Sequence, residues 1–315
     1  MLDEFPLWFL RAFAIAFGLI WGSFLNVVIY RVPLGKSVVH PPSHCTRCGA
    51  NVKPWQNLPV LSWVLLRGRT GCCGKPLSAR YPLVEALGGL CAWGILETRV
   101  LTLSPTTSVA FGGAVFLSFL AVTLGMVAAA FIDAEHLYLP GSITIGGAIL
   151  GGATASLRGM SFVESALGAV IAFLVVWVPF ILLYEKVRGQ PGMGLGDAKL
   201  LALAGAWFGW PGALFVLGAG AVQGAIGAGV LLLTRGKLED TEAVKREREA
   251  VLAEIAALPE EEREEALAEW NRDPIAHEAP DALRSRMPFG PFLALAVVEL
   301  VMFQTHIADF LLGGL

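Results

Sequence analysis

Charged residues are scarce in this chain. Asp, Glu, Lys and Arg make up 16% of its 315 residues, whereas they make up about a quarter of a soluble globular protein. Hydrophobic residues make up 55%, and the mean hydropathy is +0.65. This composition excludes a soluble globular domain. It predicts an all-α polytopic membrane protein, because a helix needs roughly 20 mostly apolar residues to cross a bilayer.

The N-terminus lacks the basic segment that opens a secretory signal peptide. Asp3 and Glu4 precede the first apolar run, so we expect that run to remain as a membrane helix. About eight membrane helices are predicted, of which two lie within residues 200–233 on either side of a break at Gly209–Gly212. The others cover about residues 7–30, 82–101, 109–132, 142–157, 163–184 and 289–310.

Acidic residues are absent from the loop between Arg31 and Arg80, which holds eight Lys or Arg residues. The positive-inside rule therefore places this loop in the cytoplasm and the N-terminus outside. Alternation of the spans then puts the ends near residues 133 and 197 on the cytoplasmic side. The same alternation leaves the C-terminus outside.

Residues 235–286 differ from the rest of the chain, because they hold fifteen acidic and nine basic residues against eleven and fourteen elsewhere. We expect a soluble cytoplasmic insertion, with two short helices over residues 241–270 interrupted at Pro259. A solvated spacer is favoured over a partner-binding element. The chain thus divides into a first helix and cysteine loop (1–81), a membrane core (82–234), the insertion (235–286) and a last membrane helix (287–315).

Two carboxylates stand where apolar segments begin or end. Asp197 follows the glycine pair in Met193–Leu200, and Asp133 ends an apolar run in Phe131–Pro140. The glycines permit close backbone approach and unusual backbone angles, although a plain helix N-cap would also explain Asp197. Two adjacent carboxylates cannot both ionise, so one can polarise a scissile carbonyl while the other activates water. The roles of the two aspartates, and of Lys199, are left open.

Four cysteines occur in the basic loop, as Cys45-x-x-Cys48 and the adjacent Cys72 and Cys73. Thiols in a reducing cytoplasm indicate metal rather than a disulfide. Paired Cys-x-x-Cys spacings are typical of tetrahedral zinc, but the second pair is irregular here. Four cysteines, three cysteines completed by His44 or water, and no metal all remain open. The fifth cysteine, Cys91, lies inside a predicted span and is expected to serve packing.

The two aspartate motifs resemble those of the bacterial type IV prepilin peptidases, which are membrane aspartyl proteases of the GxGD class. Segments Asn57–Trp63, Ser78–Glu85 and Met287–Ala294 resemble the same family. The resemblance implies a bifunctional enzyme of the bacterial inner membrane whose active site faces the cytoplasm. Such an enzyme removes a basic leader from type IV prepilins or type II secretion pseudopilins. It then methylates the new N-terminal amine with S-adenosylmethionine.

The resemblance implies that Asp133 and Asp197 are the catalytic pair. This chain departs from the family at Thr70, where many members have a cysteine, with Cys72 shifted by two positions. It also has Gly141 where an acidic residue often follows the proline, so that carboxylate is either missing or supplied by Glu135.

Other membrane carboxylates leave room for different hypotheses. Glu85 is expected to pair with Arg80, whereas Glu299 is deeper and unexplained. An ion- or proton-coupled transporter would use Asp133, Asp197 and Glu299 as a relay, but it should hold them near the midplane. A non-enzymatic zinc-loop scaffold is a further alternative, and an archaeal-type preflagellin peptidase is disfavoured by the cysteine loop. We expect prepilins and the lipid bilayer as partners and no nucleic acid.

Overall fold

The structure is a computed structural model that describes residues 4–45, 47–189, 191–235, 242–271 and 288–312. Over these residues the chain is helical, with isolated β-bridges in the cysteine loop and no strand. The α-helices are α1 (Leu7–Arg31), α2 (Leu61–Leu65), α3 (Arg80–Ile95), α4 (Val109–His136), α5 (Gly141–Ala153), α6 (Phe162–Val176), α7 (Tyr184–Arg188), α8 (Leu195–Arg235), α9 (Glu242–Ala256), α10 (Glu260–Trp270) and α11 (Gly290–Leu312).

Among the described residues, four helical segments are long and apolar enough to cross a membrane, and α5 and the first part of α11 are shorter apolar helices. The four are Leu7–Arg31, Val109–His136, Phe162–Arg188 and Leu195–Thr234. The described apolar segments all lie in helices, as expected. The predicted total of eight spans remains a prediction.

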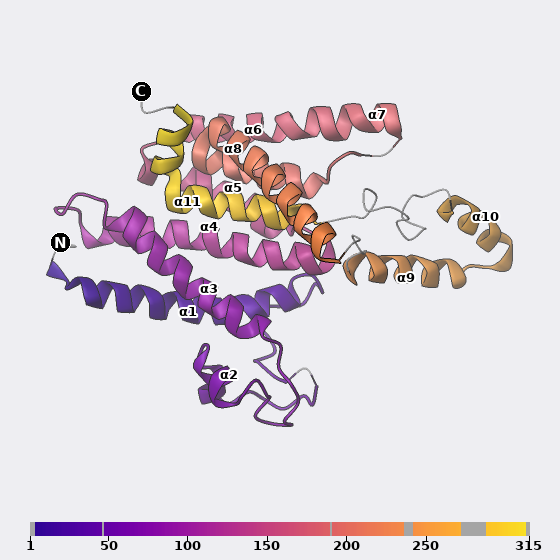
Figure 1. The fold of residues 1–315 in the computed structure, drawn as a ribbon, viewed down its shortest axis with the longest axis horizontal. Helices are drawn as coiled ribbons and strands as arrows, with labels where there is room; N and C mark the ends of the chain where they lie inside the picture. The colour runs from indigo at the N-terminus through magenta and orange to yellow at the C-terminus, as the bar shows by residue number, and fades with distance from the viewer. Residues whose placement is uncertain (1–3, 46, 190, 236–241, 272–287, 313–315) are drawn as a thin grey trace.

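Helix α8 is broken at Gly209, where φ is 69° and ψ is 176°. Only glycine adopts this conformation readily, and Pro211 lacks the N–H that a continuous helix would need. The two halves of α8 run in opposite directions (Figure 1). Gly196 begins the first half beside Leu139, and Gly224 lies in the returning half beside Phe289. The predicted break and return are confirmed.

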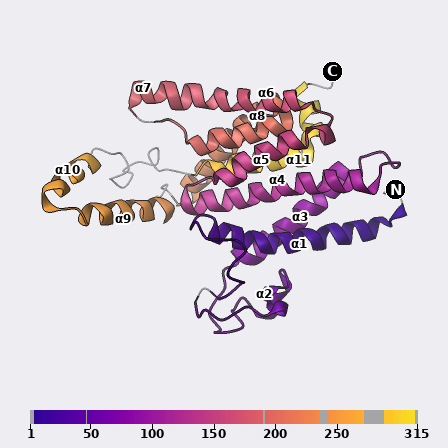
Figure 2. The same ribbon diagram turned by 180° about the vertical axis from the view of Figure 1, so that it is seen from behind.

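Helix α4 lies between two groups of helices (Figures 1 and 2). On one side it packs against α1 and α3, and on the other against α5 and α11, with α8 and α6 beyond. Glycines allow the close crossings that are common between membrane helices. A Cβ added at Gly88 of α3, for example, would lie 2.8 Å from the Cα of Gly22 in α1.

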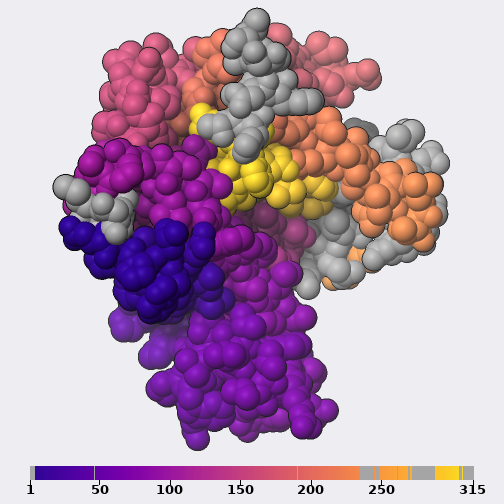
Figure 3. Space-filling view, turned by 60° about the vertical axis from the view of Figure 1, so that its left-hand side comes forward, coloured from indigo at the N-terminus to yellow at the C-terminus, as the bar shows by residue number. Residues whose placement is uncertain are grey.

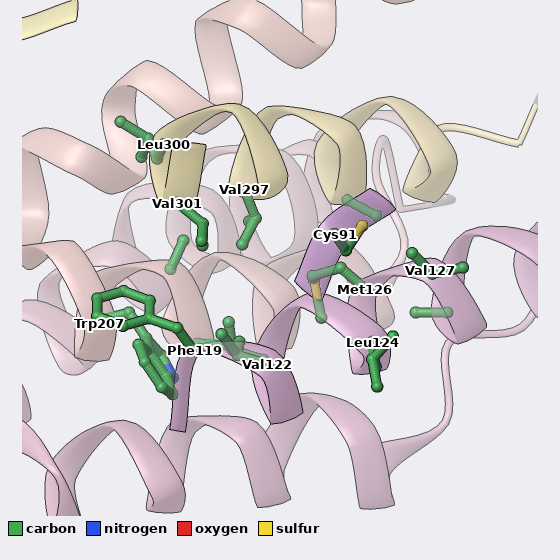
Figure 4. Close-up of a cluster of buried hydrophobic side chains, with 14 of the residues drawn as sticks. Cys91, Phe119, Val122, Leu124, Met126, Val127, Trp207, Val297, Leu300 and Val301 are labelled. Atoms are coloured by element: carbon green, nitrogen blue, oxygen red, sulfur yellow. The ribbon is translucent and has the colours of Figure 1, made fainter. Parts of the chain in front are cut away.

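The core around α4 is apolar and closely packed (Figure 4). Phe119 and Met126 of α4 are buried, and the Phe119 ring lies 5.4 Å from the ring of Trp207 in α8, centroid to centroid. Val297 of α11 is fully buried. Cys91 is 6% exposed within this core, so its predicted packing role is confirmed.

Two segments project from the bundle. The loop that carries α2 and the cysteines stands out from one side, next to α1 and α3 (Figures 1 and 3). Helices α9 and α10 extend beyond the end of α4 (Figure 2), and they confirm the prediction of two short helices interrupted near Pro259. Residues 236–241 and 272–287 of the predicted insertion lie outside the described residues.

Candidate active site

Asp133 lies near the C-terminal end of α4 and is 7% exposed. Its Oδ2 atom accepts a hydrogen bond of 3.0 Å from the backbone N–H of Gly290, the first residue of α11. The N-terminus of α11 thus faces the carboxylate, and the helix dipole favours negative charge there. A Cβ at position 290 would lie 2.6 Å from this oxygen, so only glycine fits without displacement.

Asp197 lies in the first turn of α8 and is partly buried. Gly194 leaves space for its carboxylate, because a Cβ there would lie 3.2 Å from the Asp197 Oδ2 atom. Gly196 lets α8 approach Leu139, since an added Cβ would lie 3.0 Å from the Cβ of that residue. The expected close approach is therefore confirmed. The expectation of unusual backbone angles is wrong, because neither glycine has a positive φ.

Leu139 joins the two aspartate motifs. It follows α4 after Leu137, whose left-handed conformation (φ 50°, ψ 37°) ends the helix and redirects the chain toward Pro140. Buried Leu139 contacts both Gly196 at the start of α8 and Gly290 at the start of α11. Asp133 is also close enough to Asp197 for direct electrostatic repulsion. The structure therefore brings the two predicted carboxylates together.

Gly290 is a neighbour of this pair that the sequence argument did not identify. The sequence does indicate that a helix begins at Gly290, because a Gly-Pro dipeptide after a charged segment is a common helix start. What the sequence does not reveal is that this helix start faces Asp133.

Glu135 and Arg80 form an ion pair across α4 and α3, and the second carboxylate oxygen lies 2.6 Å from Arg80 Nη1. The predicted pairing of Arg80 with Glu85 is therefore wrong. Glu85 instead accepts a hydrogen bond of 2.7 Å from the backbone N–H of Val60 in the cysteine loop. The ion pair joins the start of α3 to α4, the helix of Asp133, and the hydrogen bond joins the cysteine loop to α3.

Glu299, which the sequence left unexplained, has a hydrogen-bond partner in the structure. Its Oε2 atom accepts a hydrogen bond of 2.8 Å from Gln223 Nε2, between α11 and the returning half of α8. Asp133 and Asp197, in contrast, stand at helix ends. A relay through the middle of the bundle has no support in this arrangement.

The cysteine loop contains two backbone turns of the same kind, offset by 25 residues. In the first, Cys45 N–H donates to Ala50 and Gly49 N–H donates to Cys45. In the second, Thr70 N–H donates to Lys75 and Gly74 N–H donates to Thr70. Thr70 therefore occupies the position that corresponds to Cys45.

Cys72 supplies the fourth thiol that a cysteine at position 70 would have supplied. Its Sγ atom lies 3.4 Å from that of Cys48, while the Sγ atoms of Cys45 and Cys73 are 4.0 Å apart. All four lie within 4.8 Å of one another. Sulfur ligands of a tetrahedral zinc ion, at about 2.3 Å from the metal, are roughly 3.8 Å apart. The four thiols fit zinc. His44, the alternative ligand, instead places its Nδ1 atom 3.0 Å from the carbonyl oxygen of Pro42.

Backbone and hydroxyl groups support thiolates at two of these positions. Hydrogen bonds from the backbone of Arg47 and Cys48 lower the pKa of Cys45. The Thr70 hydroxyl, 3.2 Å from Cys73 Sγ, and the Lys75 backbone lower the pKa of Cys73 to about 6. The Thr70 hydroxyl thus contacts the cluster through Cys73, and it also donates to the Lys75 carbonyl at 3.2 Å.

Known protein families match both the region of the cysteine loop and the region of the two aspartates. Residues 16–98 match the Bacterial Peptidase A24 N-terminal domain, and residues 120–229, which include both aspartates, match the Type IV leader peptidase family. A prepilin leader peptidase/N-methyltransferase of Myxococcus xanthus is 35% identical over 317 residues, covering 92% of this chain and 89% of the relative.

The chain belongs to the type IV leader peptidase family. Relatives with the same name in Pseudomonas putida and Aeromonas hydrophila are 37% and 35% identical. They cover 70% and 72% of this chain and 80% and 83% of their own lengths. No solved structure matches. The resemblance stated from the motifs is confirmed, and the transporter hypothesis finds no support.

Proposed function

We propose that this chain is a prepilin leader peptidase that also methylates the N-terminal amine it releases. The observation that carries the proposal is the meeting of Asp133 and Asp197 around Leu139, in a chain of this family. The substrates are type IV prepilins or type II secretion pseudopilins. S-adenosylmethionine is the methyl donor.

Asp133 and Asp197 perform the cleavage as a unit. Two neighbouring carboxylates share one proton, and their titration belongs to the pair. The protonated partner donates a hydrogen bond to the scissile carbonyl, and the ionised partner takes a proton from the attacking water. The proton then passes to the departing amine, which becomes the new N-terminus and the acceptor of the methyl group.

The cysteine loop is a structural zinc site with Cys45, Cys48, Cys72 and Cys73 as ligands. Its role is to order a segment that has little apolar core, because the free energy of metal binding in such loops is free energy of folding. The Glu85–Val60 hydrogen bond holds the ordered loop against α3, and the Arg80–Glu135 ion pair holds the start of α3 against α4, the helix of Asp133.

The membrane arrangement that fits this chemistry has eight spans, with both termini outside and the active site facing the cytoplasm of a bacterial inner membrane. The two halves of α8 then count as separate spans. Residues 1–81, 82–234, 235–286 and 287–315 retain the four roles assigned from the sequence. The insertion is a spacer, and neither family match extends into it.

The direct test uses the purified full-length protein and a peptide that joins a basic leader to a hydrophobic pilin helix. We expect one cut at the leader junction. With S-adenosylmethionine present, the mature product should also gain the mass of one methyl group. An intact peptide would contradict the peptidase assignment, and cleavage without methylation would contradict only the second activity.

A further inference from the structure

A cavity of about 810 Å³ lies at the end of the bundle opposite the aspartates. Phe119 of α4 lines it, and Asp133 lies 14 residues further along the same helix, which is about 20 Å at 1.5 Å per residue. The cavity adjoins the break of α8 at Gly209. It is therefore separate from the peptidase chemistry.

Two arginines line this cavity. Arg99 donates from Nε and Nη2 to the carbonyls of Val301 and Leu300, at 2.6 and 2.7 Å. Arg158 donates to four carbonyls near helix ends, those of Gly151, Thr154, Ala206 and Trp207. The simplest role of both side chains is to cap these broken helices, and carbonyl dipoles satisfy most of their donors.

Capping does not neutralise the charges. Neither Arg99 nor Arg158 forms an ion pair with a carboxylate in the part of the chain that the structure describes. Both side chains line the same cavity. Glu164 also lines the cavity, but its carboxylate accepts a hydrogen bond of 2.7 Å from the Ser161 backbone N–H and caps its own helix. The two cations therefore outnumber the single carboxylate.

A small apolar depression of about 10 Å³, with room for roughly one water molecule, adjoins the cavity between α6 and α8. The two hollows share Ile171 and Trp210, and the depression extends toward Val175 and Leu201. Only apolar residues line it. Because α6 and α8 are candidate spans, this direction leads from the bundle end toward the middle of the membrane.

The mouth of the cavity is surrounded by exposed apolar side chains. Leu167 is 55% exposed and Trp210 is 51% exposed, and both line the cavity. In a membrane-spanning bundle such side chains face lipid. A ligand can thus enter sideways from the bilayer, with a polar group in the cavity and a hydrocarbon chain against Leu167 and Trp210.

We propose that this cavity binds an anionic phospholipid, with its phosphodiester beside Arg99 and Arg158 and one acyl chain against the exposed side chains of Leu167 and Trp210. Guanidinium groups match phosphate oxygens in geometry and charge. A zwitterionic lipid would place an ammonium group near the same arginines and lose part of this attraction. The exposed apolar side chains at the mouth explain why a lipid is favoured over a free anion.

The test compares two substitutions at Met160, which lines the cavity without capping a helix. The variant Met160→Glu adds a negative charge beside the arginines, and Met160→Gln is its neutral match. Full-length protein is incubated with vesicles of phosphatidylglycerol and phosphatidylcholine, purified, and examined by native mass spectrometry. We expect one phosphatidylglycerol to be retained by the wild type and by Met160→Gln, and about tenfold less by Met160→Glu.

Each other outcome overturns the proposal. Equal retention of phosphatidylcholine would mean that the arginines do not select the head group. Equal retention of phosphatidylglycerol by both variants would place the lipid elsewhere. Displacement of the lipid by inorganic phosphate alone would indicate a site for a free anion. Peptidase activity should be the same in both variants, which controls for folding.

Discussion

Replacing Gly290 with alanine tests the geometry around Asp133. The added Cβ would lie 2.6 Å from the Asp133 Oδ2 atom and 2.8 Å from its Cγ atom, whereas ordinary contacts begin at 3.4 Å. The carboxylate or the start of α11 must therefore move by about 0.8 Å. Catalytic groups tolerate displacements of about 0.5 Å.

The size of the effect follows from this displacement. A misplacement of about 1 Å can lower a catalysed rate about 100-fold. Loss of the Gly290 N–H hydrogen bond to a charged group would contribute about 1.5–3 kcal/mol, which by itself is about tenfold or more in rate. We therefore expect Gly290→Ala to lower kcat for leader removal by about 100-fold.

The assay is cleavage of the leader peptide by purified enzyme, with kcat and KM measured separately. Gly113→Ala is the matched control, because it lies in the same helix as Asp133 and an added Cβ there meets nothing within 4 Å. Alanine also favours helix, so neither variant should fold poorly for reasons of propensity. Full activity in Gly290→Ala would refute the described contact between α11 and the carboxylate.

Three further predictions concern the parts around the aspartates. Metal analysis of the wild type should give about one zinc per chain, and replacing Cys45 and Cys48 with serine should release it; methylation should fall first while some cleavage survives. Unchanged methylation with lost cleavage would assign the loop to substrate capture. Deleting residues 237–284 and joining the ends by a short Gly/Ser linker should preserve cleavage, and loss of activity in a protein that still reaches the membrane would contradict the spacer role. Neutralising Arg80 or Glu135 should slow cleavage, and the variant with the two charges exchanged should recover part of the lost rate. A double-mutant cycle should give a coupling free energy of about 0.5–3 kcal/mol between the two residues. A coupling near zero would show that this ion pair does not contribute to cleavage.

Local patterns were sufficient to predict most helices. Apolar runs bounded by polar residues predicted the helical segments, and the Gly209–Pro211 break predicted the reversal in α8. Alanine and glutamate around Pro259 predicted α9 and α10. These features depend on residues close in sequence, so no tertiary contact is needed to infer them.

Partners distant in sequence were harder to predict. Glu85 lies nearer in sequence to Arg80 than Glu135 does, and proximity suggested the wrong pair, because the packing of α3 against α4 decides the contact. The contact between Gly290 and Asp133 joins residues 157 apart. Neither composition nor helical periodicity contains that information.

The cysteine loop shows a third kind of limit. Spacing alone made Cys72 look misplaced, since Thr70 interrupts the second Cys-x-x-Cys pattern. The fold shows that Thr70 corresponds to Cys45 by backbone hydrogen bonding, while Cys72 reaches Cys48 from within the second turn. Sequence spacing fixes the turn but not the direction of each thiol.

The central claim is that Asp133 and Asp197 act together in leader removal. It is tested most directly by measuring cleavage of the leader peptide, by mass, for Asp133→Asn and Asp197→Asn proteins inserted normally in the membrane. Each asparagine keeps the side-chain shape but removes one half of the proton-sharing pair. We predict no detectable cleavage by either variant. Cleavage at the wild-type rate by either one would contradict the aspartyl mechanism.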